Sequence, residues 1–129
     1  MKVKDCNIND EHMKVLPDQD LSIVKNKYCH FLVVVNEKKP IGIVTNNDIV
    51  KKIKNEEDYK RLKFRDIMSS PVVSVSLDDD MEKVGKIMIE KGFMSLPVVN
   101  KKGDFVGLVT YFDYLGFISK KLKNFKKNN

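Results

Sequence analysis

The chain has 129 residues, of which 42% are hydrophobic and 33% charged, a balance typical of a folded domain and not of a disordered chain. It has no run of about 18 apolar residues and no signal-peptide core at its start, so we expect a cytoplasmic protein without a membrane span. The net charge is +6, but residues 120–129 contain five lysines, so the rest is nearly balanced. We expect this tail to be a solvated end, with nucleic acid an unfavoured partner.

The first half of the chain predicts short elements followed by a charged connector. Residues 15–21 lead from an apolar segment into acidic residues, which is a helix-start signal, but the helix that follows is cut to one or two turns around residues 21–25. Residues 54–63 are dominated by charged side chains and predict a connector. A small apolar anchor follows, formed by Phe64, Ile67 and Met68.

The second half predicts a longer series of elements. Residues 73–77 alternate apolar and polar side chains, which predicts a half-buried strand. Three aspartates at 78–80 can accept from free N–H groups, and the apolar spacing after them predicts a helix from Met81 that stops at Gly92. The remaining elements are a strand at 96–99, a polar turn at 101–104, a strand at 105–109 and a helix from about Tyr111 to Leu122.

The two halves are copies of one unit. Residues 26–50 align without a gap with residues 91–115 at an offset of 65 (107 − 42). The aligned pairs include Gly42 with Gly107, Thr45 with Thr110, and Asp48 with Asp113. Upstream, residues 15–21 align with residues 75–81 at an offset of 60, so the first copy is shorter by five residues (65 − 60). Each copy reads strand, helix, strand, strand, helix, which is a mixed α/β (α+β) unit.

The order of elements and the motif Gly-hydrophobic-Val-Thr-x-x-Asp at the end of the third strand resemble the CBS domain, the cystathionine β-synthase-type regulatory repeat. The second copy is the cleaner match, at residues 66–73, 93–99 and 107–113. The resemblance implies two β-α-β-β-α repeats packed about a pseudo-twofold axis, the arrangement called a Bateman module. It divides the chain into a first repeat at 1–54, a connector at 55–63, a second repeat at 64–122 and a basic tail at 123–129.

The resemblance also implies a function. Pairs of these repeats form clefts for AMP, ADP, ATP or S-adenosylmethionine, and modules associate as homodimers. The chain has no nucleophile-elbow, phosphate-loop or metal motif, so we predict a non-enzymatic regulatory module that requires no cofactor. It would stand alone and signal to a separate partner protein by a ligand-induced population shift. The alternative is a ligand-free dimerisation or interaction scaffold.

Thr110 and Asp113 are the strongest candidate ligand residues. The resemblance assigns the aspartate to a ribose diol and the threonine to a neighbouring ligand oxygen, which suits a carboxylate that accepts two hydrogen bonds. The structural alternative is a helix capping box, but such boxes prefer Glu or Gln, and Asp should be too short to reach back. Thr45 and Asp48 repeat the pair in the first copy.

The adenine ring requires an apolar slot with backbone groups at its edge. By resemblance, Val72, Val73, Leu96 and Pro97 form this slot in the second copy. Ordinary core packing is the alternative for all four, and it fits Val73 better than Val72. His30 is the candidate phosphate contact in the first copy, with a backbone-satisfied histidine as the alternative. Its counterpart Ser95 is uncharged. Arg61 and Arg65 lie near the connector and could face a cleft, with an ion pair to a nearby acid as the alternative for Arg65.

We expect one working site, built on Thr110 and Asp113. The shortened helix removes one wall of the first copy, and the acidic residues 10–11 would repel phosphate there. Gly42 and Gly107 lie inside strands, where glycine indicates the close approach of a helix or a ligand. No metal site is predicted, because the two cysteines and two histidines match no ligand spacing.

Overall fold

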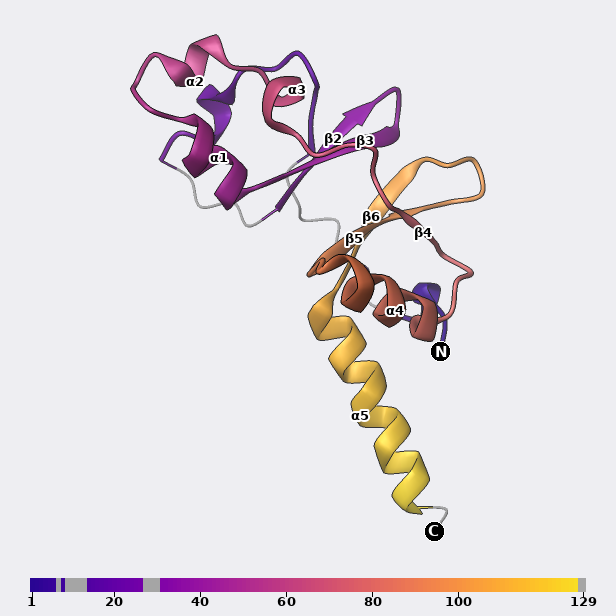
Figure 1. Ribbon diagram of the computed structural model, residues 1–129. Coiled ribbons are helices and arrows are strands. Elements are labelled where there is room, and N and C mark those ends of the chain that lie inside the picture. Colours follow the sequence, from indigo (N-terminus) through magenta and orange to yellow (C-terminus); the bar gives the residue numbers. More distant parts are fainter. Residues whose placement is uncertain (7, 9–13, 27–30, 128–129) are drawn as a thin grey trace.

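A computed structural model describes residues 1–6, 8, 14–26 and 31–127 (Figure 1). Its elements in chain order are η1 (Val3–Asp5), β1 (Lys14–Val15), η2 (Leu21–Val24), β2 (Phe31–Asn36), β3 (Lys39–Thr45), α1 (Asn46–Lys52), α2 (Asp58–Arg61), α3 (Phe64–Ile67), β4 (Val75–Ser76), α4 (Met81–Lys91), β5 (Ser95–Val99), β6 (Phe105–Thr110) and α5 (Tyr111–Lys127), where η marks a 3-10 helix. No helix in these residues is long and apolar enough to cross a bilayer.

Two three-stranded sheets repeat the same topology. In the first, β2 lies between a parallel β1 and an antiparallel β3, and in the second, β5 lies between a parallel β4 and an antiparallel β6. Val34 pairs with Gly42 and Val98 with Gly107, and each register shifts immediately after that pair. The bulge therefore occupies the same place in both repeats. The offset of 65 holds between β3 and β6 (107 − 42), but β2 and β5 are equivalent at an offset of 64 (98 − 34), so the gapless alignment is wrong by one residue in the central strand.

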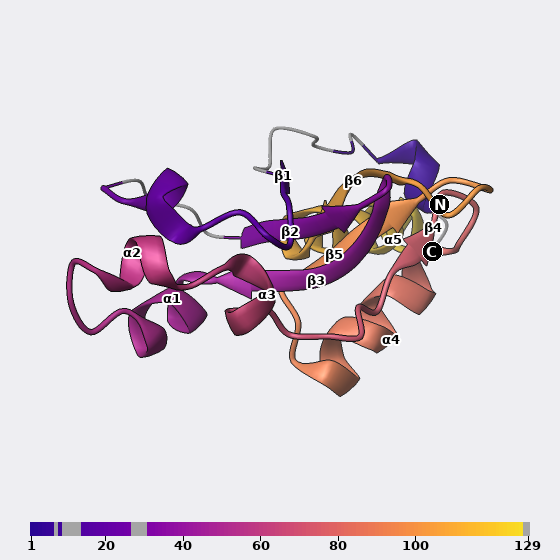
Figure 2. The same ribbon diagram turned by 90° about the horizontal axis from the view of Figure 1, so that it is seen from above.

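Each repeat has its own hydrophobic cluster. The fully buried side chains of the first cluster include Leu32 and Val34, and those of the second include Val98 and Val109. Val33 is also fully buried, yet strand geometry directs it to the opposite face from its neighbours. Both faces of the central strands are therefore covered, one by helices of the same repeat and the other where the two repeats meet (Figures 1 and 2).

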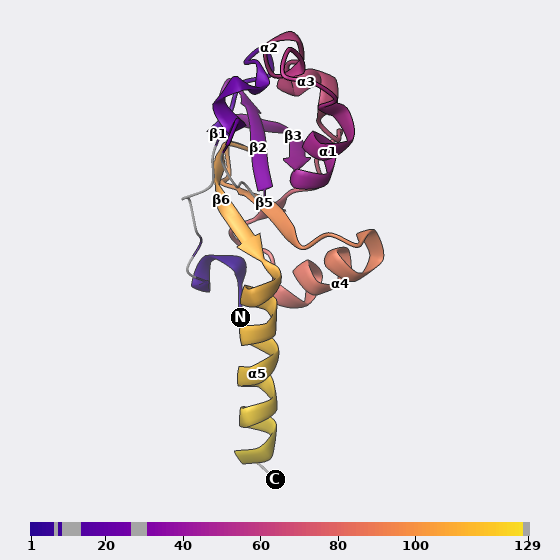
Figure 3. The same ribbon diagram turned by 90° about the vertical axis from the view of Figure 1, so that its left-hand side faces the viewer.

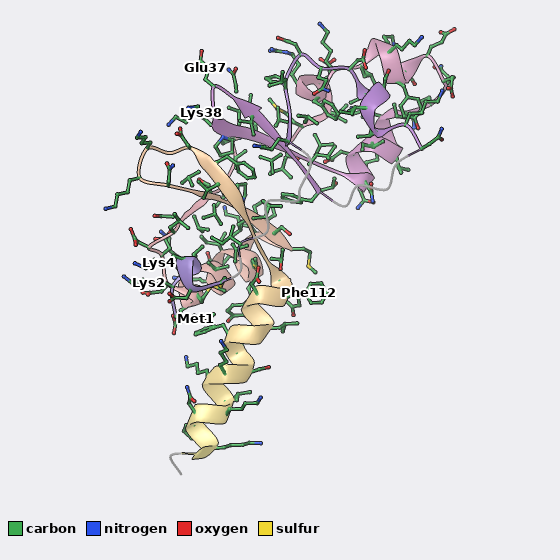
Figure 4. The ribbon with its side chains drawn as sticks, turned by 180° about the vertical axis from the view of Figure 1, so that it is seen from behind. Met1, Lys2, Lys4, Glu37, Lys38 and Phe112 are labelled. Carbon is green, nitrogen blue, oxygen red and sulfur yellow. The ribbon has the colours of Figure 1, made fainter. Side chains whose placement is uncertain are left out.

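The segments that lead into the two repeats are exchanged in space. Val3 is fully buried in the cluster of the second repeat, and its N–H donates to the carbonyl of Asp79 at 2.9 Å. Phe64 is fully buried in the cluster of the first repeat, and its N–H donates to the carbonyl of Gln19 at 3.0 Å. Residues 2–5 and 63–66 thus occupy equivalent places, each on the repeat that it does not precede (Figures 1 and 4).

The β2–β3 hairpin of the first repeat contacts the β5–β6 turn of the second. The N–H of Phe105 donates to the carbonyl of Lys38 at 2.8 Å, and Lys39 Nζ lies 2.9 Å from Asp104 Oδ1. Figure 4 shows Glu37 and Lys38 at the hairpin tip beside this turn. The hydrogen bond from Lys39 lowers the pKa of Asp104 below its ordinary value, which makes the contact sensitive to acid.

Several predicted elements differ from the structure. The strand predicted at 73–77 is reduced to β4, and the last helix continues five residues past Leu122 to Lys127, so most of the tail is helical. The connector contains the four-residue helix α2, which packs on η2. The shortened helix is confirmed as η2, and α4 ends at Gly92, whose φ of 70° is the left-handed conformation that glycine adopts most readily.

Candidate functional site

Thr110 and Asp113 are brought together where β6 becomes α5. Asp113 Oδ2 accepts hydrogen bonds from the Thr110 N–H at 2.7 Å and from Thr110 Oγ1 at 3.0 Å. The Asp113 N–H donates to Thr110 Oγ1 at 3.4 Å. Both side chains are half-buried. The pair therefore forms a capping box, and the expectation that an aspartate is too short to reach back was wrong.

Thr45 and Asp48 form the same arrangement at the start of α1. Asp48 Oδ2 lies 2.9 Å from the Thr45 nitrogen and 3.1 Å from Thr45 Oγ1. In both repeats, Oδ1 of the aspartate has no hydrogen-bond partner among the described residues. Each carboxylate consequently caps its helix with one oxygen and keeps the other available.

Pro97 limits how far β4 pairs with β5. The Met94 carbonyl faces β6 and accepts a hydrogen bond from the Tyr111 N–H. The Val99 carbonyl faces β4 and accepts a hydrogen bond from the Leu77 N–H. Because backbone groups alternate along a strand, the Pro97 nitrogen faces the β4 side. It has no hydrogen to donate, so the β4 ladder begins only with Val75 opposite Val98.

The end of this ladder leaves a backbone edge at the start of β5. Ser95 faces the same side as Pro97, and β4 has no residue opposite it. Val72 and Val73 run past this edge outside any strand, and both are half-buried. A backbone edge that no strand pairs with, beside apolar side chains, is the arrangement that an adenine ring requires. The sequence already contained the signal for this edge, since a proline in a central strand is unusual.

The predicted slot residues do not all face the same environment. Leu96 is 1% exposed and belongs to the hydrophobic cluster of the second repeat, as core packing predicts. Val73 is half-buried and packs against that cluster from outside, whereas Val72 is not among its contacts. Pro97 is buried on the opposite face of β5 from Leu96. Among the predicted slot residues, Val72 and Pro97 are therefore the two that do not belong to or pack against the hydrophobic cluster of the second repeat.

The basic candidates are either paired or outside the described residues. Arg61 donates to Asp58 Oδ1 at 2.9 Å, and Arg65 donates to Asp18 Oδ1 at 2.6 Å, so both guanidinium groups have carboxylate partners. His30 and the acidic residues 10–11 lie outside the described part of the chain. The described residues contain no group of three His, Cys, Asp or Glu side chains that could hold a metal ion.

Gly42 and Gly107, the two glycines inside strands, are explained by different features of the structure. A Cβ on Gly42 would lie 2.3 Å from Met68 Sδ, because residues 68–69 cross β3 and Ser69 pairs with Ile43. The close neighbour is thus the lead-in to the second repeat, neither a helix nor a ligand. Gly107 has a φ of 154° beside the bulge at Val98, a conformation that other residues rarely adopt.

Two surface hollows lie away from the Thr-Asp pairs. One is lined by the start of the chain, α4 and α5, and the other by β4 and the β5–β6 turn. Both are open and mix charged with apolar side chains. Neither contains a residue that the sequence nominated for ligand binding.

Comparisons with known proteins agree with this geometry. The family model described as "CBS domain" matches residues 10–55 and 64–120. An uncharacterised protein of Methanopyrus kandleri, MK0525, is 41% identical over 86 residues, which are 65% of this chain and 44% of that protein. A homoserine O-acetyltransferase of Methanococcus vannielii is 33% identical over 88 residues, but the match spans only 18% of that enzyme. The chain spans less than half the length of these relatives.

Solved structures have the same fold. The cytosolic domain of the Mg²⁺ channel MgtE, in complex with ATP, superposes with a TM-score of 0.72 at 25% identity, covering 85% of this chain and 46% of that one. The structure of CBSX2 in complex with AMP superposes with a TM-score of 0.75 at 20% identity, covering 95% and 98% of the two chains. The second likeness extends over nearly both whole chains, which places β1 to α5 in one shared two-repeat architecture.

Proposed function

Since the chain belongs to the CBS-domain family, we propose that it is a regulatory module that binds an adenosyl ligand between its repeats. The ligand would be AMP, ADP, ATP or S-adenosylmethionine, and the bound module would signal to a partner protein. Two proteins with this fold have structures in complex with an adenine nucleotide, CBSX2 with AMP and the MgtE cytosolic domain with ATP. These complexes support an adenine nucleotide as the first ligand to test. The absence of a catalytic motif in the sequence supports regulation over catalysis.

The observation that carries the proposal is the second oxygen of Asp113. Oδ2 fixes the carboxylate against Thr110, and Oδ1 has no partner in the described structure. A carboxylate held in this way loses little side-chain freedom when it accepts from a ribose diol. The 17-residue helix behind it also directs free N–H groups and a positive dipole toward an anionic ligand.

The second repeat is the better candidate of the two. The corresponding aspartate of the first repeat, Asp48, stands at the start of a helix of only seven residues, and the four-residue η2 takes the place of α4 in its repeat. The open backbone at Ser95, with Val72, Val73 and Pro97 nearby, supports an adenine slot next to Asp113. Leu96 would support this slot from the core side, and Thr110 would contact the sugar or phosphate.

The test is a thermal-shift panel with AMP, ADP, ATP and S-adenosylmethionine on wild type, Asp113→Ala and Asp48→Ala. Each variant loses one equivalent helix cap, so the loss of the cap itself cancels in the comparison. At a ligand concentration 100 times the dissociation constant, wild type should gain about 2.7 kcal/mol of stability. Asp113→Ala should lose most of that gain, and Asp48→Ala should keep it.

Two results would contradict the proposal in different ways. Equal shifts in all three proteins would remove Asp113 from the site. A wild type that responds to none of the four ligands would favour the interaction scaffold, in which both Thr-Asp pairs only cap helices. The capping contacts already present at both pairs are the observation that favours this second function.

A further inference from the structure

Helix α5 has an apolar seam along one side. Tyr111, Leu115, Ile118, Leu122 and Phe125 follow one another at spacings of four, three, four and three residues. This alternation keeps one residue of each turn on the same narrow line, which is the pattern of a coiled-coil seam. The seam extends over two heptads, and its last residue, Phe125, lies in the part of the helix beyond Leu122, where the sequence predicts a solvated end.

Within the seam, Ile118 is half-buried and packs against the hydrophobic cluster of the second repeat, but most of the helix's contact with the body comes from another side. Phe117 is 6% exposed in the core of the second repeat, and Tyr114 covers Gly85 of α4. Those two side chains define the inward side of the helix. Leu115 and Leu122, by contrast, are 43% and 58% exposed. Figures 1 and 3 show that the second half of α5 projects away from both sheets, which agrees with the exposure of Leu122.

Lysines border the seam in the last turns of α5, and this part of the helix contains no acidic residue. With Leu115 and Leu122 at position a of a heptad, Lys121 takes position g and Lys126 position e. The chain has no acidic residue after Asp113. Lys121 does face Glu82 of α4, but at 3.8 Å and with both side chains largely exposed. A second copy of α5 in parallel orientation would place Lys121 against Lys126, which disfavours this pairing of the helix with itself.

We propose that the α5 seam binds an amphipathic helix of another protein, one with apolar residues at a and d and glutamate or aspartate at e and g. Complementary charges at these flanking positions set the choice of partner in coiled coils. The last ten residues of α5 contain only three apolar side chains, and all three lie on the seam. Such a stripe is narrower than the broad apolar face with which helices lie on lipid. The proposal adds a partner class to the signalling step of the proposed function.

The binding test uses the full chain without any nucleotide, so its failure leaves adenosyl binding untouched. The probes are two synthetic three-heptad peptides with leucine at a and d, one with glutamate and one with lysine at e and g. Fluorescence anisotropy at low salt should show the acidic peptide binding at least about tenfold more tightly than the basic one. Leu122→Gln should weaken binding of the acidic peptide by a similar factor, with the helix content of the protein unchanged.

A charge swap separates recognition at the seam from general attraction. Lys121→Glu with Lys126→Glu should reverse the preference toward the basic peptide. Lys120→Glu with Lys123→Glu makes the same change in charge away from the seam and should keep the acidic preference, reduced only by long-range screening. If the two double variants behave alike, or if wild type does not distinguish the peptides, the proposal is wrong.

Two other results would contradict the proposal by showing that something other than an acidic helix binds the α5 seam. Dimerisation of wild type in light scattering that Leu122→Gln abolishes would make the seam a contact between copies of this chain. Capture on vesicles of phosphatidylserine and phosphatidylcholine, with no binding of the acidic peptide, would make it a lipid-binding helix.

Discussion

The two repeats share the Thr-x-x-Asp helix cap, but different helices pack on them. In the second, the eleven-residue helix α4 packs on α5, with the Tyr114 ring directly over Gly85. In the first, the four-residue η2 takes the place of α4, and α2 from the connector packs on it, with Tyr59 and Leu62 against the cluster. The comparison teaches that the sheet and helix cap come from the repeat itself, whereas its helical cover can come from elsewhere in the chain.

The connector is consequently a structural part of the first repeat. Asp58 is 4% exposed and accepts from the N–H groups of Lys54 and Asn55, at 2.7 and 3.2 Å. These bonds, together with Arg61, lower the pKa of Asp58 and fix the turn that leads into α2. A charged segment thus becomes ordered because one carboxylate satisfies its backbone.

The exchanged lead-in segments provide the largest expected effect. Phe64→Ala should lower the free energy of unfolding by about 3–5 kcal/mol, and Val3→Ala by about 2 kcal/mol, since both remove fully buried side chains. Because each segment packs on the other repeat, urea unfolding followed by circular dichroism should remain a single transition in both variants. Phe64→Leu serves as a milder variant if Phe64→Ala does not fold. Two separate transitions would show that the repeats are independent.

A second prediction concerns the cover that only the second repeat has. A Cβ on Gly85 would lie 2.2 Å from the Tyr114 ring, so Gly85→Ala should destabilise the protein by about 1–3 kcal/mol. Gly116→Ala on α5 is the control, because no atom lies within 4 Å of its Cβ position. That substitution should stabilise the helix by up to about 1 kcal/mol. Thermal melts of the two variants should move in opposite directions, and a shift of the same sign would contradict the packing of α4 on α5.

The equivalence of the two caps can be tested without ligand. Asp113→Ala and Asp48→Ala remove the same pair of contacts, so each should lower stability by about 1 kcal/mol. Urea denaturation of the two variants measures this directly. A much larger loss for Asp48→Ala would indicate that α1 depends on its cap more than the 17-residue α5 does.

The smallest effect concerns the contact between the hairpin and the β5–β6 turn. The pKa of Asp104 is lowered by Lys39, so the pair stabilises the fold above the ordinary aspartate pKa of about 3.9 and loses this contribution as the pH falls through the lowered value. Lys39→Met should flatten this part of the stability curve. Melting temperatures measured between neutral pH and about pH 3 will show the change, and identical curves for the two proteins would exclude the contact as a source of acid sensitivity.

Much of the fold could be predicted from the sequence because its signals are local. The duplicated Thr-x-x-Asp placed both helix starts correctly, and Gly92 placed the end of α4. The length of β4 was wrong because alternation of side chains does not show that Pro97 cannot donate to the ladder. The end of α5 was wrong because a run of lysines was taken as a solvated end, although lysine is a good helix former.

By itself, the sequence determined that there are two repeats, the order of elements within each, and where the Thr-Asp pairs stand, since these depend on residues close together in the chain. Only the tertiary structure decided that Val3 belongs to the second core and Phe64 to the first. It also decided that the connector replaces a missing helix and that Met68 crosses β3 at Gly42. These contacts join distant parts of the chain, where burial of apolar surface, rather than local propensity, selects the partner.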